Sequence, residues 1–215
     1  DAFLLVGQSN MAGRGELDNK NDNKSQKTII NGHEILSFDC NNLWVQAKDP
    51  LHSDKPDKCG IGPGLSFAKL TAELGIIETN RKIGLIPCAI GGTSIKQWLP
   101  SSKSASASLS NIDINKDDGI FEQTIQKTIL ALNTKFESQS KSKLLRKTKN
   151  GSILSYSTDT DDDGKLNDSN NFDIELKGIL WHQGESDCDT IHNANEYLSN
   201  ATLLFQYFRK YLNND

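Results

Sequence analysis

The chain opens with an uninterrupted apolar run. Residues 2–6 read Ala-Phe-Leu-Leu-Val, and they lead directly into residues 7–13, Gly-Gln-Ser-Asn-Met-Ala-Gly. A continuous apolar run that ends in a glycine turn predicts a strand covered on both faces, as in a parallel sheet. Ligands bind at the carboxyl ends of such strands, so Ser9 stands where a nucleophile is useful. The same residue types are also ordinary in a turn after any strand.

Apolar runs and helical stripes then alternate along the chain. Residues 83–87 and 177–181 predict two more buried strands. Apolar side chains recur at helical spacing over residues 65–74, 120–136 and 192–212. Strands that alternate with helices predict an α/β fold with a parallel sheet. We expect a three-layer α/β/α sandwich with a flavodoxin-like strand order.

Polar inserts separate these elements. The chain has 215 residues and is 35% hydrophobic, which fits one domain over residues 1–215 with a modest core. Residues 15–28 and 138–171 are rich in Ser, Lys, Asn, Asp and Thr. Such segments bury too little apolar surface to order themselves, so we expect two mobile inserts.

The second insert contains a partial calcium-loop pattern. Residues 159–167 place aspartates at the first, third and fifth positions and a glycine at the sixth. The twelfth position is Asn170 instead of the bidentate glutamate, and no helical pattern flanks the segment. We therefore expect no metal site and no cofactor, although the segment from Asp159 to Asn170 keeps calcium binding open.

Four segments in order along the chain resemble a known enzyme family. They are residues 7–13, residues 60–68 (Gly-Ile-Gly-Pro-Gly-Leu-Ser-Phe-Ala), residues 87–95 (Pro-Cys-Ala-Ile-Gly-Gly-Thr-Ser-Ile) and residues 181–187 (Trp-His-Gln-Gly-Glu-Ser-Asp). They resemble the sialate O-acetylesterase and acetylxylan esterase domain, which is carbohydrate esterase family six of the SGNH hydrolases. Together they are far more specific than any one segment alone. The resemblance implies the SGNH hydrolase fold.

The resemblance also implies roles for individual residues. Ser9 would attack the acetyl carbonyl and form an acyl-enzyme. The backbone N–H groups of Ser9 and Gly92 and the side-chain amide of Gln183 would bind the oxyanion, and Gly91 is the alternative to Gly92. Glu185 would support the catalytic histidine. A carboxylate at a helix N-terminus is the other interpretation of Glu185, since the helix dipole favours one there.

The sequence departs from the family in its general base. SGNH esterases carry a late Asp-x-x-His segment, which this chain lacks. Its histidines are His33, His52, His182 and His192. His182 precedes Gln183 on a predicted strand, and adjacent strand residues face opposite sides, so both cannot point into one site. The chain also begins at Asp1 instead of Met. We expect a C-terminally incomplete esterase domain, and this piece alone is expected to be inactive if the base is missing.

Two further residues are candidate substrate contacts. His52 stands in a loop that also resembles the family, where it either lines the acyl pocket or fixes the loop. Trp98 follows the Gly91-Gly92 turn and either presents an aromatic face to a sugar ring or belongs to the core.

Charge and cysteines limit the partners. The net charge is −4 and the basic residues are scattered, which argues against a nucleic-acid partner. The sequence contains no membrane-spanning run, and the compartment stays open. The cysteines lack metal-site spacing, and Cys40 and Cys59 are the better candidates for a disulfide.

The resemblance thus implies a serine esterase that removes acetyl groups from sialic acid or from a xylan-type polysaccharide, with acetylated carbohydrate as its partner. A non-catalytic carbohydrate-binding or scaffold domain with the same fold is the alternative. An α/β-hydrolase is disfavoured because the segment around Ser9 lacks the second glycine of a G-x-S-x-G turn.

Overall fold

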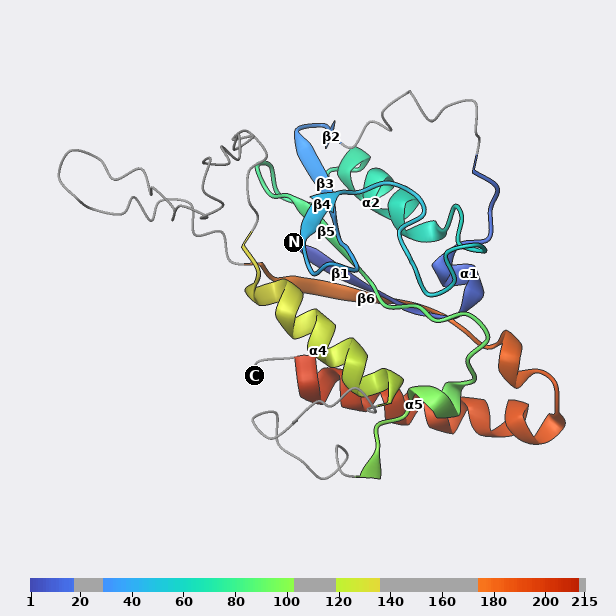
Figure 1. Cartoon of the computed structure of the whole chain (residues 1–215). Coiled ribbons are helices and arrows are strands. Elements are labelled where there is room, and N and C mark those ends of the chain that lie inside the picture. Colours follow the sequence, from blue (N-terminus) through green and yellow to red (C-terminus); the bar gives the residue numbers. More distant parts are fainter. Residues whose placement is uncertain (18–28, 103–118, 136–173, 213–215) are drawn as a thin grey trace, which may run out of the picture. The chain divides into compact units, whose positions relative to one another are not determined.

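The computed structural model describes residues 1–17, 29–102, 119–135 and 174–212 as a mixed α/β fold around a mostly parallel sheet (Figure 1). These elements belong to one compact unit formed by residues 1–134 and 174–215. A second unit, residues 135–173, lies outside the described residues except for Lys135. The fold class predicted from the alternating pattern is therefore confirmed at the level of an α/β fold with a mostly parallel sheet.

The sheet has the order β2-β3-β5-β1-β6, and the sixth strand, β4, pairs with β3. Strands β1 (Ala2–Gly7), β3 (His33–Phe38), β5 (Ile83–Pro87) and β6 (Leu176–His182) run parallel. The short strands β2 (Ile29–Ile30) and β4 (Trp44–Gln46) each pair antiparallel with β3. Strand β1 lies between β5 and β6, with Leu4 opposite Ile86 on one side and Ile179 on the other. All six of its residues are buried, which explains its unbroken apolar sequence.

Helices flank both faces of this sheet. Figure 1 shows α2 (Pro63–Glu73) on one side of β1 and β6, and α4 (Ile120–Asn133) and α5 (Ile191–Leu212) on the other. On the α2 side, Leu65 and Ala68 pack in one core cluster with Phe3, Leu5 and Leu85. On the other side, the ring of Phe121 in α4 contacts three aromatic rings of α5, those of Tyr207, Phe208 and Tyr211. Strand β6 is less covered than β1: none of its residues is buried and Ile179 is 36% exposed, so the buried strand predicted over residues 177–181 is only partly buried.

The three strands predicted from the sequence lie in the predicted relative order. A flavodoxin-like sheet has the order 2-1-3-4-5, which places the first strand between the next two. In the structure β1 lies between β5 and β6, the next two of the predicted strands. Strand β3, which the apolar runs did not predict, lies beside β5 and extends the sheet on that side.

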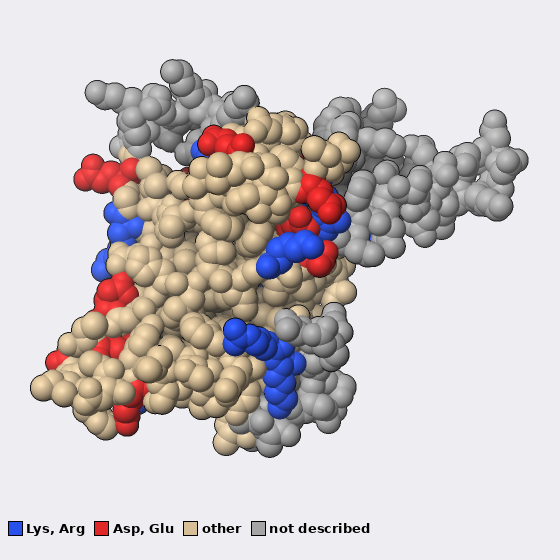
Figure 2. Space-filling view, turned by 180° about the vertical axis from the view of Figure 1, so that it is seen from behind, with Lys and Arg blue, Asp and Glu red and all other residues tan. Residues whose placement is uncertain are grey.

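The two predicted inserts fall mainly on residues that the structure does not describe, namely 18–28 and 138–171. At the start of the first insert, Gly15 is ordered and forms an antiparallel bridge with Ile61. No helix among the described residues is long and apolar enough to cross a membrane. On the face seen in Figure 2, lysine and arginine side chains lie singly or in small groups, with acidic side chains beside several of them.

Of the two states that the sequence leaves open for Cys40 and Cys59, a disulfide or free thiols, the structure has both as free thiols. Cys40 is exposed, whereas Cys59 is buried and its thiol donates a hydrogen bond to Asp54 Oδ1 at 3.0 Å. Burial together with the hydrogen bond to Asp54 raises the pKa of the Cys59 thiol. The Cys59 side chain is therefore a protonated thiol that is fixed in place by its hydrogen bond to Asp54.

Candidate active site

Ser9 lies where strand β1 ends and a short helix begins. Helix α1 (Ser9–Ala12) starts at Ser9, and the Gly13 N–H donates to the Ser9 carbonyl at 3.0 Å. The Ser9 side chain is half-buried. Neither its hydroxyl nor its backbone N–H has a hydrogen-bond partner among the described residues. The residue therefore offers a hydroxyl and a backbone donor at the carboxyl end of a central strand.

The turn after β5 lies directly beside Ser9. A Cβ added to Gly91 would be 3.6 Å from the Ser9 Cβ. The Gly91 N–H is already bonded, to Asp54 Oδ2 at 2.7 Å. The Gly92 N–H, in contrast, makes no hydrogen bond within the part of the chain that the structure describes, and Gly92 has φ of +85°. Of the two glycines that the sequence leaves open, Gly92 has the available N–H.

Gln183 is buried at the end of β6, and its amide nitrogen lies among three acceptors. Nε2 donates to Asp187 Oδ2 at 2.6 Å, to the Thr93 carbonyl at 2.9 Å and to Gln8 Oε1 at 3.1 Å. Its Oε1 is buried without a hydrogen-bond partner in the described structure. Because the amide has two hydrogens for three acceptors, these bonds compete with one another.

Asp187 is a site residue to which the sequence analysis gave no role. Its carboxylate is buried, and Oδ2 accepts hydrogen bonds from Gln183 Nε2 and from the Ile95 backbone N–H at 2.9 Å. It thereby joins η3 (Glu185–Asp187) to η1 (Ile95–Trp98), the short helix after the Gly91-Gly92 turn. The available signal was its position in the same motif as Gln183. Its partners could not be read from that motif.

Glu185 is exposed and accepts a hydrogen bond from Asn10 Nδ2. Asn10 follows Ser9 in α1, so this bond brings Glu185 to the same end of the sheet as the serine. The structure therefore gathers Ser9, Gly92, Gln183 and Glu185, which the sequence analysis selected, around the ends of β1, β5 and β6.

None of the histidine side chains is bonded to Ser9 in the described part of the chain. His33 is buried, with Nδ1 2.8 Å from the Arg81 carbonyl, and His192 is exposed, with Nε2 3.4 Å from Glu196 Oε1. His182 is exposed whereas Gln183 is buried, as their adjacent places on the chain predict. No histidine in the described ranges donates to or accepts from Ser9.

The chain matches a family model in sequence and two solved structures in fold. The family model described as "carbohydrate esterase, sialic acid-specific acetylesterase" matches residues 1–139 and 163–215. The chain belongs to this family. The resemblance inferred from the sequence segments is therefore confirmed.

Individual relatives agree with this assignment. The esterase-family chain is 29% identical over 221 residues to a probable carbohydrate esterase of Arabidopsis thaliana, covering 98% of this chain and 64% of that protein. An X-ray structure of an Arabidopsis thaliana protein matches with a TM-score of 0.59 and 27% identity, over 99% of this chain and 69% of that one. The crystal structure of NanS matches with a TM-score of 0.53 and 17% identity, over 98% and 61%, which shows the fold. The chain thus spans less than two thirds of the curated relative.

His52 of this esterase-family chain is a buried, neutral imidazole. It is 5% exposed, and its Nε2 has no hydrogen-bond partner among the described groups. Burial lowers the pKa of His52 from 6.5 to about 4. A hydrogen bond with the Leu5 backbone raises this pKa, but by less than burial lowers it. Lys127 and Arg14 also lower this pKa, and Asp54 raises it. Of the two roles considered, fixing the loop against β1 is the one that this burial supports.

The lowered pKa predicts a stability change with pH. Between about pH 6.5 and pH 4 the unfolded chain protonates at His52 while the folded chain does not, so acid favours unfolding. We expect the free energy of unfolding to fall by roughly 3 kcal/mol across this window through His52. Urea unfolding at several pH values should show this slope in the wild type and a weaker slope in His52→Gln. Equal slopes in the two proteins would contradict the prediction.

Of the two interpretations of Trp98, its burial supports a place in the core. Its indole is fully buried, its Nε1 donates to Thr93 Oγ1 at 2.9 Å, and its ring meets Trp181 edge to face at 5.3 Å. An aromatic side chain after a turn fits either a binding face or a core, and here η1 turns it inward beside β6. Trp98 therefore packs beneath the site and supports the Gly91-Gly92 turn.

Among the described residues no group of three or more His, Cys, Asp or Glu side chains could hold a metal ion. The partial calcium pattern from Asp159 to Asn170 lies outside those residues.

Proposed function

We propose that this chain carries the nucleophile and the oxyanion hole of a serine esterase that removes O-acetyl groups from carbohydrate. The observation that supports it most directly is Ser9 at the end of β1, with its own N–H and that of Gly92 both without hydrogen bonds in the described part of the chain. Ser9 Oγ attacks the acetyl carbonyl, and the negative charge that forms on the carbonyl oxygen is stabilised by these two donors. A general base takes the Ser9 proton and returns it to the sugar oxygen as the C–O bond to the sugar breaks, and water then hydrolyses acetyl-Ser9 to acetate.

We assign the third oxyanion donor to the Gln183 amide. Its two hydrogens are shared among three acceptors, so an oxyanion would replace one of the weaker partners, of which Gln8 Oε1 at 3.1 Å is the most distant. Asp187 holds the amide through the shortest of the three bonds, at 2.6 Å. In this proposal Asp187 fixes the position of the amide while the other hydrogen serves the substrate.

Ser9 also needs a general base, because a serine hydroxyl is a weak nucleophile by itself. The four histidines of the chain are all described, and Ser9 makes no hydrogen bond to any of them. This chain covers 64% of the curated relative, so that protein extends beyond the matched region. We propose that the base is a histidine of the complete protein outside these 215 residues, supported by Glu185.

We interpret the fold as the three-layer α/β/α sandwich of SGNH hydrolases. The helices α2 on one face and α4 and α5 on the other support this assignment (Figure 1). As in other α/β sheets, the proposed site lies at the carboxyl ends of the parallel strands.

The proposal is tested by comparing substrates and proteins. Acetate release should be measured for the complete protein and for the 215-residue chain, on an aryl acetate, O-acetylated sialic acid and acetylated xylan. We expect turnover by the complete protein on at least one acetylated sugar and little or none by the shorter chain. Binding of acetylated sugar without turnover by the complete protein would favour a carbohydrate-binding domain instead.

A further inference from the structure

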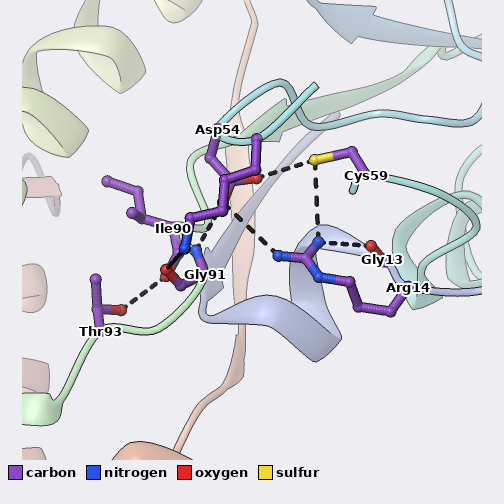
Figure 3. A network of polar contacts seen from close by, with 8 residues as sticks. Gly13, Arg14, Asp54, Cys59, Ile90, Gly91 and Thr93 are labelled. Atoms are coloured by element: carbon purple, nitrogen blue, oxygen red, sulfur yellow. Dashed lines mark hydrogen bonds and ion pairs between the residues drawn. The ribbon is translucent and has the colours of Figure 1, made fainter. Parts of the chain in front are cut away.

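A network of polar side chains surrounds the Gly91-Gly92 turn and is not explained by the proposed catalytic groups. It includes Arg14 after α1, Asp54, Lys55 and Cys59 in the loop after β4, and the turn itself. Figure 3 shows the Asp54 carboxylate between Arg14 and Cys59 on one side and Gly91 on the other. Segments far apart in the sequence therefore meet at one glycine beside Ser9.

Two consecutive side chains hold the backbone of Gly91. The Gly91 N–H donates to Asp54 Oδ2 at 2.7 Å, and the Gly91 carbonyl accepts a hydrogen bond from Lys55 Nζ at 2.6 Å. Both are charge-assisted hydrogen bonds, which are shorter and stronger than those between neutral groups. One loop thus fixes the peptide on each side of Gly91.

The second of these peptides also contains the Gly92 N–H. The Gly91 carbonyl and the Gly92 nitrogen belong to one planar trans peptide, in which C=O and N–H point in opposite directions. Because Lys55 binds the carbonyl end, the N–H end is directed away from the ammonium. A positive charge on the carbonyl also polarises the amide and makes the N–H a better donor.

Asp54 is in turn held in place and ionised. Its side chain is 7% exposed, Cys59 Sγ donates to Oδ1 at 3.0 Å, and Arg14 lies 3.9 Å from Oδ2. Burial acts to raise the pKa of Asp54, but the hydrogen bonds from Cys59 and Gly91 and the Arg14 charge together lower it. Arg14 is itself fixed by donating to the Gly13 carbonyl at 2.7 Å.

A larger residue in the turn would disturb this network. A Cβ added to Gly91 would lie 2.4 Å from the Arg14 guanidinium and 3.1 Å from Asp54 Oδ2. A Cβ on Gly92 would lie 3.5 Å from Lys55 Nζ, an ordinary contact, so at this position the positive φ of +85° is what favours glycine. The network is therefore packed against Gly91, whose carbonyl shares a peptide with the Gly92 N–H that the proposed mechanism uses.

We propose that Lys55 is a positioning residue of the oxyanion hole. Its ammonium binds the Gly91 carbonyl and thereby aims the Gly92 N–H at the acetyl oxygen above Ser9, while Asp54 anchors the preceding peptide. This inference rests on the proposed esterase function. Lys55 itself touches neither the acetyl group nor the nucleophile in this account.

A kinetic test uses the complete protein with Lys55→Met. We expect kcat to fall about 10- to 100-fold, less than the loss of a whole donor, because the Gly92 N–H remains but is no longer held. KM should be unchanged, since the interaction strengthens only in the transition state. Lys55→Arg, which keeps a charged donor, should recover most of kcat. Lys58→Met, the same change at an exposed lysine of the same loop, should leave kcat unchanged.

A spectroscopic test does not depend on activity. Gly91-Gly92 is the one Gly-Gly pair among the 16 glycines of the chain. In the 215-residue chain labelled with carbonyl-13C, 15N-glycine, an HNCO spectrum therefore contains a single peak, which joins the Gly91 carbonyl to the Gly92 N–H. We expect this peak to move upfield in its carbonyl dimension in Lys55→Met and to stay near its wild-type position in Lys55→Arg and Lys58→Met.

The two tests separate the inference from the function on which it rests. An unmoved peak in a folded Lys55→Met protein, or an unchanged kcat, would overturn the role of Lys55. A displaced peak together with a lowered kcat and an unchanged KM would support it. If the peak moves but no Ser9-dependent esterase activity exists, Lys55 holds the peptide and the proposed function is the part that fails.

Discussion

Replacing Ser9 with alanine is expected to lower kcat for acetyl ester hydrolysis by the complete protein about 10⁶-fold, close to background. Alanine retains the backbone N–H of residue 9 but removes the oxygen that forms the acyl-enzyme in the proposed mechanism. Because Ser9 is half-buried and its hydroxyl makes no hydrogen bond to a described group, the variant should lose little folding stability. Initial rates of acetate release and thermal unfolding of the same preparation measure both quantities.

Ser186→Ala is the matched control. Ser186 is also half-buried and lies in η3 beside Gln183, but only its backbone N–H takes part in the site, donating to Gln8 Oε1 at 3.3 Å. This variant should keep kcat near the wild-type value. A Ser9→Ala protein that retains kcat would assign the chemistry to a different residue.

Gly7→Ala is expected to destabilise the fold by more than about 4 kcal/mol, or to prevent folding, because two structural costs act together. Gly7 has φ of +134°, which side chains rarely adopt, and an added Cβ would lie 2.1 Å from the backbone oxygen of His182. The close approach of β1 to β6 at this point places Gln8 beside Gln183, so the site depends on it. Urea unfolding measures the loss.

Gly75→Ala separates the two causes. Gly75 also has positive φ, +64°, but an added Cβ would meet nothing within 4 Å. This variant should cost only the left-handed backbone energy of about 1–2 kcal/mol. If both variants lose the same stability, the contact with His182 is not what makes Gly7 necessary.

Local patterns were sufficient to locate the main elements. The strands β1, β5 and β6 and the helices α2, α4 and α5 lie where the apolar runs and stripes predict them. The buried face of α4 is less well predicted: Thr128 is fully buried, with its hydroxyl bonded to the Thr124 carbonyl, while Ile129 is 38% exposed. A threonine can satisfy its hydroxyl within the helix, so its polarity does not require exposure.

Contacts between distant segments could not be read from the sequence. Ser9 could be proposed from its place after a buried strand, and Gln183 and Glu185 from segments that resemble the esterase family. Asp187 and Lys55 gain their importance from backbone groups on other segments, the Ile95 N–H and the Gly91 carbonyl. Neither pairing leaves a periodic signal, since it depends on how the loops fold over the sheet. The same reason explains why the sequence did not predict the burial of Trp98 or the place of β3 beside β5.

The most direct test of the central claim is to detect the acyl-enzyme. The complete protein should be mixed with an aryl acetate, quenched in acid during turnover and digested with trypsin. Residues 1–14 form one expected peptide, in which Ser9 is the only hydroxyl side chain. We predict one acetyl group on Ser9 in the wild type and none on this peptide in Ser9→Ala. Turnover with acetyl on another residue, or with no acetyl at Ser9 under conditions where deacylation is slow, would contradict the assignment of Ser9 as the nucleophile.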